Sequence, residues 1–414
     1  MKCHIKKQCV RVNFFLFVYI TMSVLPRESF PMEKKTLLNG VEREVIRLSP
    51  VASTDSTAFN LSNRKINFRL PSIPNSFIDP AQSYITFKVT LSAAGKKFYG
   101  CPFREFTLKA SDSKILERVQ SYGEFWHMQS FLKHSADFDN YRLINGISET
   151  AKTGASFYAS HYLESGIFGD GNETFLPCGN LHGFAYEMEL ELNPTAVNYT
   201  DSTSSVVLTD VALYLNVCTL PQDVYTQFLD ASGSMKLQYE SVEEHSQSFS
   251  GSNATQTIHD ANINVVKTDT IILETDADKQ IKLISKVKDH QIVYMNKQMP
   301  LQKLSVDGDV NKINSLMYNI AQNGKRVGQQ LVSDWVKASA YGSSYRVSQS
   351  FKKSRDAMIL SGLNTMKSAA PIEVKLTFDS PLSSHTMITF VRKAYALTIV
   401  DGKFSVVDDT TCSC

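Results

Sequence analysis

The sequence predicts an all-β protein made of two β-sandwich domains in tandem. Apolar and polar residues alternate in segments of both halves of the chain, which is typical of strands with one buried face. Regular amphipathic helices do not separate these segments, so a parallel α/β fold is not expected. A length of 414 residues suggests two domains, because one domain has roughly 100 to 200 residues.

The first half contains four alternating segments, and we expect each to form a strand. A stretch rich in Pro and Asn, residues 71–80, separates the first two and predicts a turn. The third segment carries three glutamates between its apolar residues, so that face is expected to meet solvent or a partner. The apolar positions are Ile66, Phe68 and Leu70; Ile85, Phe87, Val89 and Leu91; Phe184, Tyr186, Met188, Leu190 and Leu192; and Val211, Leu213, Leu215 and Val217.

Connections in the first half are predicted to be long. Residues 92–115 and 145–180 are interpreted as loops, and short helical pieces are expected within 121–180. Pro221 opens and Gly233 closes a short predicted helix, where we place the domain boundary. The predicted organisation is an N-terminal arm at 1–39, a first sandwich at 40–232 and a second sandwich with a tail at 233–414.

The second half is also predicted to be rich in strands. The stretch 243–257 is interpreted as a loop because it is polar. Asn323-Gly324 and Asp401-Gly402 are hairpin signals, because both central residues of a type I′ turn need positive φ. Expected strands include Met235, Leu237 and Tyr239; 263–266; 270–273; 281–284; 291–295; Leu316, Tyr318 and Ile320; Ile372, Val374, Leu376 and Phe378; and the flanks of Asp401-Gly402.

Charge and cysteine content exclude several classes of protein. The chain has 43 Lys and Arg against 41 Asp and Glu, so no specific nucleic-acid site is expected. The seven cysteines lack the paired spacing of a zinc site or a disulfide framework. We expect Cys101, Cys178 and Cys218 to be small buried residues, while Cys412 and Cys414 lie in a tail whose redox state stays open.

The N-terminus allows two interpretations. A basic start leads into an apolar stretch, residues 12–25, with the charge and length of a signal-peptide core. A clean cleavage site does not follow, and Met22 and Met32 are alternative starts. The segment is therefore either a real signal or anchor, or an over-extended start.

No catalytic, cofactor or metal motif is found, so the chain is not expected to be an enzyme. It lacks a G-x-S-x-G nucleophile motif and a phosphate-binding loop. The histidines share no metal-binding spacing, and the string Asp307, Asp309 and Asn311 departs from a calcium loop at Lys312 and Tyr318. No small-molecule substrate is indicated. The histidines concerned are His127, His134, His161 and His182. Gly166, Gly169 and Gly171 lack the spacing of a phosphate-binding loop, and their stretch is predicted to be an ordinary loop.

Three stretches, 60–91, 181–221 and 361–407, resemble the opening strands, the closing strands with the helix that follows them, and the final strands of double jelly-roll major capsid proteins of DNA viruses. The similarity is greatest to those of polinton-like, adintovirus-like and virophage-like elements. It covers under half of the chain and includes no sharp signature, and the apolar N-terminus departs from the pattern.

This resemblance implies two tandem jelly rolls, with short helices in the loops. It further implies a homotrimer that forms a pseudo-hexameric capsomer, contacts with neighbouring capsomers, and penton and minor capsid proteins as partners. The protein would be assembled inside the infected cell and reside in the icosahedral shell of the virion.

Two other classes remain open. A secreted or surface-anchored β-sandwich glycoprotein would fit the signal-like start and the sequons at Asn60, Asn172, Asn198 and Asn253, but not the missing disulfide pattern. A glycan-active enzyme would need a carboxylate pair across a cleft, and no residues indicate such a pair.

Overall fold

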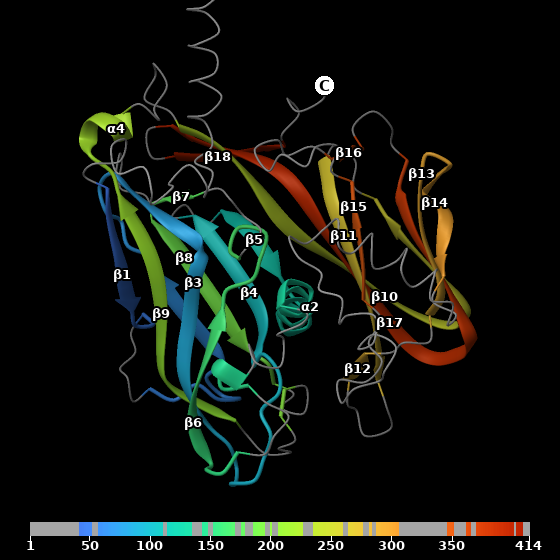
Figure 1. Cartoon of the computed structure of the whole chain (residues 1–414), viewed down its shortest axis with the longest axis horizontal. Coiled ribbons are helices and arrows are strands. Elements are labelled where there is room, and N and C mark those ends of the chain that lie inside the picture. Colours follow the sequence, from blue (N-terminus) through green and yellow to red (C-terminus); the bar gives the residue numbers. More distant parts are fainter. Residues whose placement is uncertain are drawn as a thin grey trace, which may run out of the picture.

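A computed structural model of the chain shows antiparallel β structure with two helices among the residues it describes. Two bodies lie side by side, which we call the first sandwich (β1 to β9) and the second sandwich (β10 to β18) (Figure 1). The described residues are 41–51, 57–110, 114–134, 143–147, 152–169, 175–178, 185–194, 199–200, 206–226, 235–259, 264–275, 281–283, 287–305, 346–351, 362–365, 370–400 and 403–408.

The first sandwich has two sheets. One has the order β1-β9-β3-β6, with the short β7 beside β3, and the other has the order β2-β8-β4-β5. Consecutive long strands alternate between the sheets except for the hairpin β4–β5, which is the winding of a jelly roll. The bounds are β1 Glu42–Leu48, β2 Lys65–Arg69, β3 Ser76–Thr90, β4 Phe103–Ala110, β5 Ile115–Val119, β6 Ser156–Tyr162, β7 Leu176–Pro177, β8 Tyr186–Leu192 and β9 Val207–Thr219.

The second sandwich repeats this order. Residues 385–394 of β17 lie between β10 and β11, and β15 pairs with β11, which gives β10-β17-β11-β15. Residues 372–378 of β17 lie between β10 and β13, which gives β10-β17-β13-β14. The bounds are β10 Met235–Ile258, β11 Asn264–Thr275, β12 Ile281–Leu283, β13 Val287–Tyr294, β14 Lys297–Ser305, β15 Arg346–Ser350, β16 Leu363–Asn364, β17 Ile372–Val400 and β18 Lys403–Asp408.

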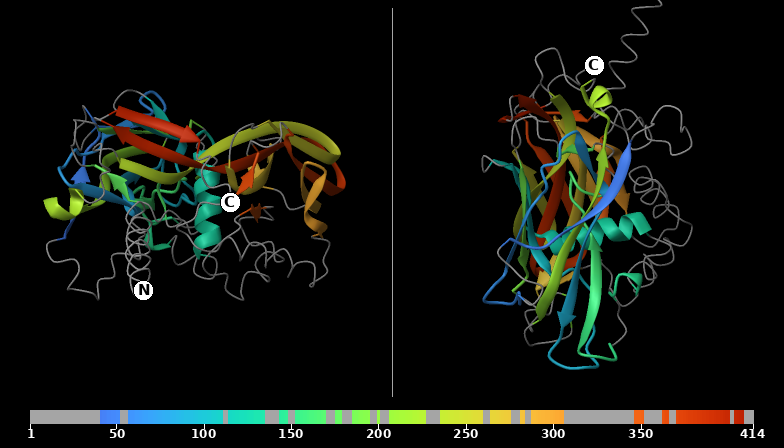
Figure 2. Two further views of the ribbon diagram at one scale, coloured as in Figure 1. Left: turned by 90° about the horizontal axis from the view of Figure 1, so that it is seen from above. Right: turned by 90° about the vertical axis from the view of Figure 1, so that its left-hand side faces the viewer.

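Both sheets of the second sandwich share β10 and β17. The register of this pair shifts around Gly251, where φ is 100°, and the two strands curve together there (Figure 2). Strands that pass from one sheet to the next at a bend are typical of sandwich corners. The second sandwich therefore forms one continuous hydrogen-bonded sheet folded into two walls.

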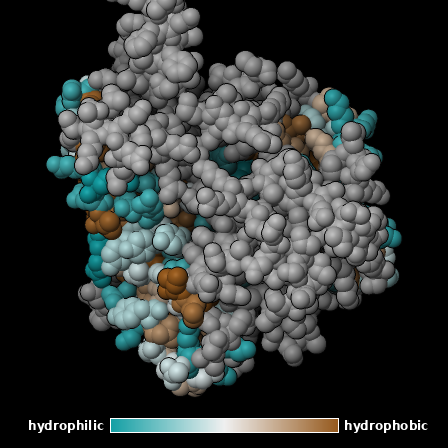
Figure 3. Space-filling model, viewed as in Figure 1, coloured by the Kyte–Doolittle hydropathy of each residue, from teal (hydrophilic) through white to brown (hydrophobic). Residues whose placement is uncertain are grey.

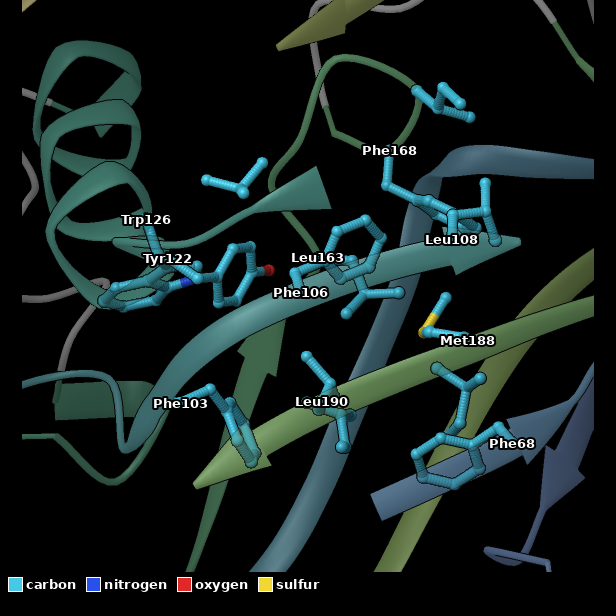
Figure 4. Close-up of a cluster of buried hydrophobic side chains, with 14 of the residues drawn as sticks. Phe68, Phe103, Phe106, Leu108, Tyr122, Trp126, Leu163, Phe168, Met188 and Leu190 are labelled. Atoms are coloured by element: carbon cyan, nitrogen blue, oxygen red, sulfur yellow. The ribbon is translucent and has the colours of Figure 1, made fainter. Parts of the chain in front are cut away.

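Aromatic residues fill the core of the first sandwich. Phe87 of β3 and Phe103 of β4 meet edge to face at 5.5 Å between ring centroids, which joins the two sheets. Figure 4 shows this core continuing through Phe106 and Tyr122 toward α2 (Tyr122–His134). Phe106 and Tyr122 stack at 5.3 Å.

The alternating segments of the sequence are strands where the structure describes them. β2, β8 and β9 have the predicted buried positions, and pairing of Val400 with Lys403 confirms the hairpin at Asp401-Gly402. The predicted helix after Pro221 is α4 (Gln222–Thr226). The hairpin at Asn323-Gly324 and the string 307–311 lie outside the described residues.

The loop predictions were partly wrong. Residues 76–80 belong to β3, where Pro80 lies at a register shift and so costs no ladder hydrogen bond. β4 lies inside 92–115, and β6 and β7 lie inside 145–180. The polar stretch 243–257 is strand, because β10 pairs with β17 along its length and needs few buried residues of its own.

Candidate functional site at the junction of the two sandwiches

Helix α2 lies between the two sandwiches (Figure 1). Glu244 of β10 accepts hydrogen bonds from the backbone N (2.6 Å) and Oγ (2.7 Å) of Ser121, directly before the helix. A carboxylate at a helix N-terminus is stabilised by the unpaired N–H groups there. Phe125 of the helix meets Phe390 of β17 at 5.0 Å between ring centroids. One helix of the first sandwich is thus fixed to two strands of the second.

A buried polar cluster continues this contact. Gln129 of α2 donates to Asp269 of β11 at 3.1 Å and accepts from Arg392 of β17 at 2.7 Å. Arg392 lies 3.5 Å from Glu240, and Lys267 lies 3.0 Å from Asp269. Burial lowers the pKa of Lys267 to about 8. Breaking one partner of such a cluster leaves a buried charge uncompensated, so the cluster holds the helix in one position.

Glu117 of β5 forms a second connection across the junction. Its carboxylate accepts hydrogen bonds from Ser165 Oγ (2.7 Å), Gly166 N (2.6 Å), Ile167 N (3.1 Å) and, across the junction, Val242 N of β10 (2.9 Å). Burial raises the pKa of Glu117, although the four hydrogen bonds favour the charged form. The edge of β5 is therefore tied to β10 through one side chain.

Close backbone approach at Gly166 tightens the same contact. A Cβ atom there would lie 2.5 Å from the Glu240 carbonyl oxygen and 2.7 Å from the Cα of Ser241. Any side chain would push the sandwiches apart, so this position requires glycine. The predicted loop of Gly166 and Gly169 is present, but its role is packing against the second sandwich.

His161 is buried in the first sandwich among aromatic rings. The ring centroids of Trp126 and Phe87 lie 4.6 and 5.2 Å from its own, and those of Phe103 and Phe98 lie slightly farther away. Neither ring nitrogen has a hydrogen-bond partner within the described chain. Burial lowers the pKa of His161 to about 3, so the ring is neutral near pH 7.

The outer face of the β1-β9-β3-β6 sheet carries tyrosines, and we call it the tyrosine face: Tyr84, Tyr158, Tyr162 and Tyr214. Figure 3 shows one side of the first sandwich, where hydrophilic, intermediate and isolated hydrophobic residues are mixed on the surface. Tyr214 of β9 stacks on Tyr84 of β3 at 4.9 Å, and Tyr162 of β6 lies 5.9 Å from Tyr84. Tyr158 is 62% exposed and Tyr162 is 40% exposed. Aromatic side chains therefore cross three neighbouring strands in one row.

A β-bulge directs Asp210 onto this face. Its φ is 49°, which is uncommon for a residue with a side chain, and the β3–β9 register shifts beside it. Its carboxylate accepts hydrogen bonds from Tyr158 Oη (3.0 Å) and from Arg47 of β1 (3.2 Å). Asp210 thus orients the side chains at both margins of the face.

The opposite outer face, on β2-β8-β4-β5, is charged. Glu189 of β8 pairs with Lys65 (2.7 Å) and Lys109 (3.1 Å), and Glu191 lies 3.6 Å from Arg64. The sequence prediction that this glutamate face meets solvent or a partner is consistent with these exposed and half-buried pairs. The outer faces of the two sheets therefore differ in chemistry.

Other residues singled out in the sequence lie apart. Cys101, Cys178 and Cys218 are buried free thiols, as predicted, and burial raises the pKa of each. His127 is buried, while His182 and the tail cysteines lie outside the described residues. Of the four sequons, Asn60 accepts hydrogen bonds from Ser62 and Asn63, Asn253 is exposed on β10, and the other two are not described.

Within the described ranges, no group of three His, Cys, Asp or Glu side chains is placed to hold a metal ion. No helix among these residues has the length and apolarity to cross a bilayer.

Solved structures resemble this chain over most of its length. PBCV-1 VP54, as fitted into a reconstruction of the virophage Sputnik, aligns with a TM-score of 0.60 at 11% identity, over 89% of this chain and 97% of that one. A chain of the Sputnik virophage itself gives 0.56 at 11% identity, over 89% of each chain. The Faustovirus major capsid protein gives 0.50 at 7% identity, over 87% and 92%. No family model and no curated protein matches the sequence.

The chain has the double jelly-roll fold. The two repeated strand orders and the match over nearly the full length of these structures agree on this point. The fold predicted from sequence is therefore confirmed.

Sequence reasoning did not find the junction. Glu244 lies in the stretch 243–257, which the sequence predicts to be a polar loop, yet its carboxylate caps α2. Lys393 of β17, for which the sequence predicts no role, is buried and paired with Glu243. Charged residues in strands that are buried on both faces would indicate such a junction. A single sequence, however, does not show which strands are buried on both faces.

Proposed function

We propose that this chain is the major capsid protein of an icosahedral DNA virus, a structural protein without enzymatic activity. The observation that carries the proposal is a pair of jelly rolls locked side by side by α2, Glu117 and the buried polar cluster. Proteins of the PBCV-1 and Faustovirus capsids resemble this chain over most of their length. A rigid double sandwich offers broad side walls for contact with further copies.

In this proposal three copies form a capsomer of pseudo-hexagonal outline, and capsomers tile the shell of the virion. A permanent trimer needs an interface of roughly 2,000 Å² or more. Weaker contacts between capsomers sum over a lattice, so assembly is cooperative without strong individual contacts. Penton and minor capsid proteins are the further partners we infer.

We also infer the domain limits 40–232 and 233–414, preceded by an arm at 1–39. Limited proteolysis that cuts near residue 232 and leaves two stable fragments would support this boundary. Cleavage first within β3 or β10 would contradict it.

Native mass spectrometry of the full chain, and in parallel of the chain started at Met32, tests the proposed function. We expect a trimer, and pseudo-hexagonal particles in electron micrographs. A stable monomer at every concentration would contradict the proposal.

A further inference from the structure

Four aromatic rings surround the imidazole of His161, and the nearest of them belongs to a helix. Phe87 and Phe103 lie on β3 and β4, and each of these strands is paired on both sides. Phe98 lies in a segment that forms a β-bridge. Trp126 belongs to α2, and its ring centroid lies 4.6 Å from that of His161. Backbone pairing therefore holds three of the rings in place, whereas the position of the fourth depends on the helix.

Side-chain contacts attach α2 to the first sandwich beside His161. The indole Nε1 of Trp126 donates to the carbonyl oxygen of Tyr162 at 2.9 Å. The Tyr122 hydroxyl accepts from the backbone N of Glu164 at 3.1 Å. Figure 4 shows the Trp126 and Tyr122 rings leaving α2 toward the strands of this sandwich. The position of the helix therefore depends on packing next to the imidazole.

The other side of the same helix contacts the second sandwich. Tyr122 and Trp126 are four residues apart, so they lie on one side of α2. Ser121, Phe125 and Gln129 repeat at the same spacing and contact β10, β11 and β17. The helix thereby covers part of the outer face of β11 and β17. A displacement of Trp126 would therefore also shift the residues at the junction.

A proton on His161 would have no counter-ion in this cage. Neither ring nitrogen has a hydrogen-bond partner within the described chain, and the elements packed on the ring present aromatic side chains. Burial accordingly lowers the pKa of His161 to about 3. Attraction of an imidazolium to the face of Trp126 is weaker than the loss of hydration of a fully buried charge. A protonated ring is therefore stable only where water reaches it.

Glu117, Glu124 and Lys267 lie near α2 and do not favour its release in acid. Burial raises the pKa of Glu117 and of Glu124, so acid protonates these carboxylates in place. Lys267 stays protonated as the pH falls, because its pKa is about 8. The other charged or titratable residues at the helix and the junction are His127, Glu240, Glu244, Asp269 and Arg392. A substitution of His161 leaves all of these groups unchanged, so it isolates the imidazole.

We propose that His161 is an acid-operated release for α2: on protonation Trp126 is displaced, water reaches the imidazole, and the helix leaves the first sandwich and loosens the junction. An imidazole in water titrates near pH 6.5. The ratio of released to bound helix should therefore be about 30-fold higher at pH 5 than at neutral pH. The consequence for a capsid rests on the proposed function: its subunits would be rigid at neutral pH and would loosen in an acidic compartment.

Hydrogen exchange of the full chain at pH 7.5 and pH 5 tests the proposal. After correction for the pH dependence of intrinsic exchange, we expect the protection of the α2 amides to fall about 30-fold in the wild type. His161→Phe, which keeps a ring in the cage but takes up no proton, should retain its protection at pH 5. His259→Gln, at an exposed histidine after β10, is the control and should lose protection as the wild type does.

Low concentrations of urea separate release of the helix from unfolding. Release exposes little surface, so exchange of the α2 amides at pH 5 should change little with urea. Exchange of the β8 amides through global unfolding should rise steeply. Equal protection and equal urea dependence in α2 and β8 would overturn the release, because the helix would then leave only when the sandwich unfolds. A His161→Phe variant that loses protection as the wild type does would overturn it as well.

Native mass spectrometry of the same samples at pH 7.5 keeps this test apart from that of the proposed function. An oligomer whose α2 amides stay protected at pH 5 would overturn the release and leave the proposed function standing. A monomer whose α2 amides lose protection as expected would overturn the proposed function and leave the release standing.

Discussion

The covered outer face of the second sandwich and the tyrosine face of the first occupy equivalent places in two copies of one fold. Ile271, Leu273, Ile388 and Phe390 make up the covered face. The tyrosine face has rings stacked in a row and a carboxylate, Asp210, that is held by Tyr158 and Arg47. The same backbone arrangement therefore serves two kinds of surface.

The two faces differ in residue composition because one is buried within the folded chain and the other is exposed to solvent. The covered face is buried as the chain folds, so aliphatic residues gain the full benefit of burial at about 25 cal/mol per Å². The tyrosine face remains in contact with water in the folded chain, which limits its exposed aliphatic area. The position of a face in the fold thus does not determine its composition, whereas its exposure to solvent does.

The largest expected effect is on the covered face. Phe390→Ala removes a fully buried ring that packs on Phe125, and should lower the free energy of unfolding by about 3 to 5 kcal/mol. Urea unfolding followed by circular dichroism measures this change. Leu61→Ala, at a residue that is 46% exposed, is the control and should change stability by less than about 0.5 kcal/mol. An equal loss in the free energy of unfolding for both variants would mean that Phe390 does not belong to a packed core.

Glu117→Gln tests the tie across the junction. The amide nitrogen of glutamine cannot accept hydrogen bonds, so at least one of the donors at Ser165, Gly166, Ile167 and Val242 loses its partner. We expect a loss of about 2 kcal/mol in the free energy of unfolding. Glu187→Gln, at an exposed residue of β8, should be neutral in the same urea titration.

Acid should lower the free energy of unfolding through His161, which is buried in the first sandwich. The pKa of His161 is about 3 in the folded chain and about 6.5 when unfolded. The unfolded chain therefore binds a proton first, and the stability present above pH 6.5 falls as the pH drops toward 3. At pH 5 this cost is about 2 kcal/mol.

The His161→Phe variant, which cannot titrate, isolates this effect. The urea midpoint of the variant should fall less between pH 7.5 and pH 5 than the urea midpoint of the wild type. An unchanged pH dependence would show that His161 is hydrated or paired in solution.

The smallest effect is expected on the tyrosine face of the isolated chain. Tyr158→Phe removes one exposed hydrogen bond to Asp210 and should change the free energy of unfolding by less than about 1 kcal/mol. Thermal unfolding at a concentration where the chain is monomeric measures this change. A loss as large as that of Phe390→Ala would place Tyr158 in the folding core and would remove the contrast between the two faces.

Much of the fold could be predicted from sequence because alternation reports one buried face. β2, β8 and β9 alternate regularly and were located with nearly correct bounds. β4 was missed because Phe106, Thr107 and Leu108 are buried in succession, so the strand lacks a period of two. β10 was cut short because its middle is polar and its order comes from pairing with β17.

The junction could not be predicted for a different reason. Its residues are brought together by tertiary contacts that span more than 100 positions, such as Gln129 with Asp269 and Glu117 with Val242. The turn between β13 and β14 shows the same limit on a local scale. Met295 and Asn296 both have positive φ there, although methionine is not a residue that indicates such a turn.

The uninterrupted course of β10 and β17 through both walls of the second sandwich has a mechanical consequence. The two walls share their central ribbon, so a pull that separates them acts on the covalent backbones of β10 and β17 at the bend near Gly251 and not only on side-chain contacts. The second sandwich should accordingly resist prying at its outer end, whereas the two sheets of the first can part once the side-chain contacts between them fail. Under mechanical load, the second sandwich should therefore be the stiffer half of the chain.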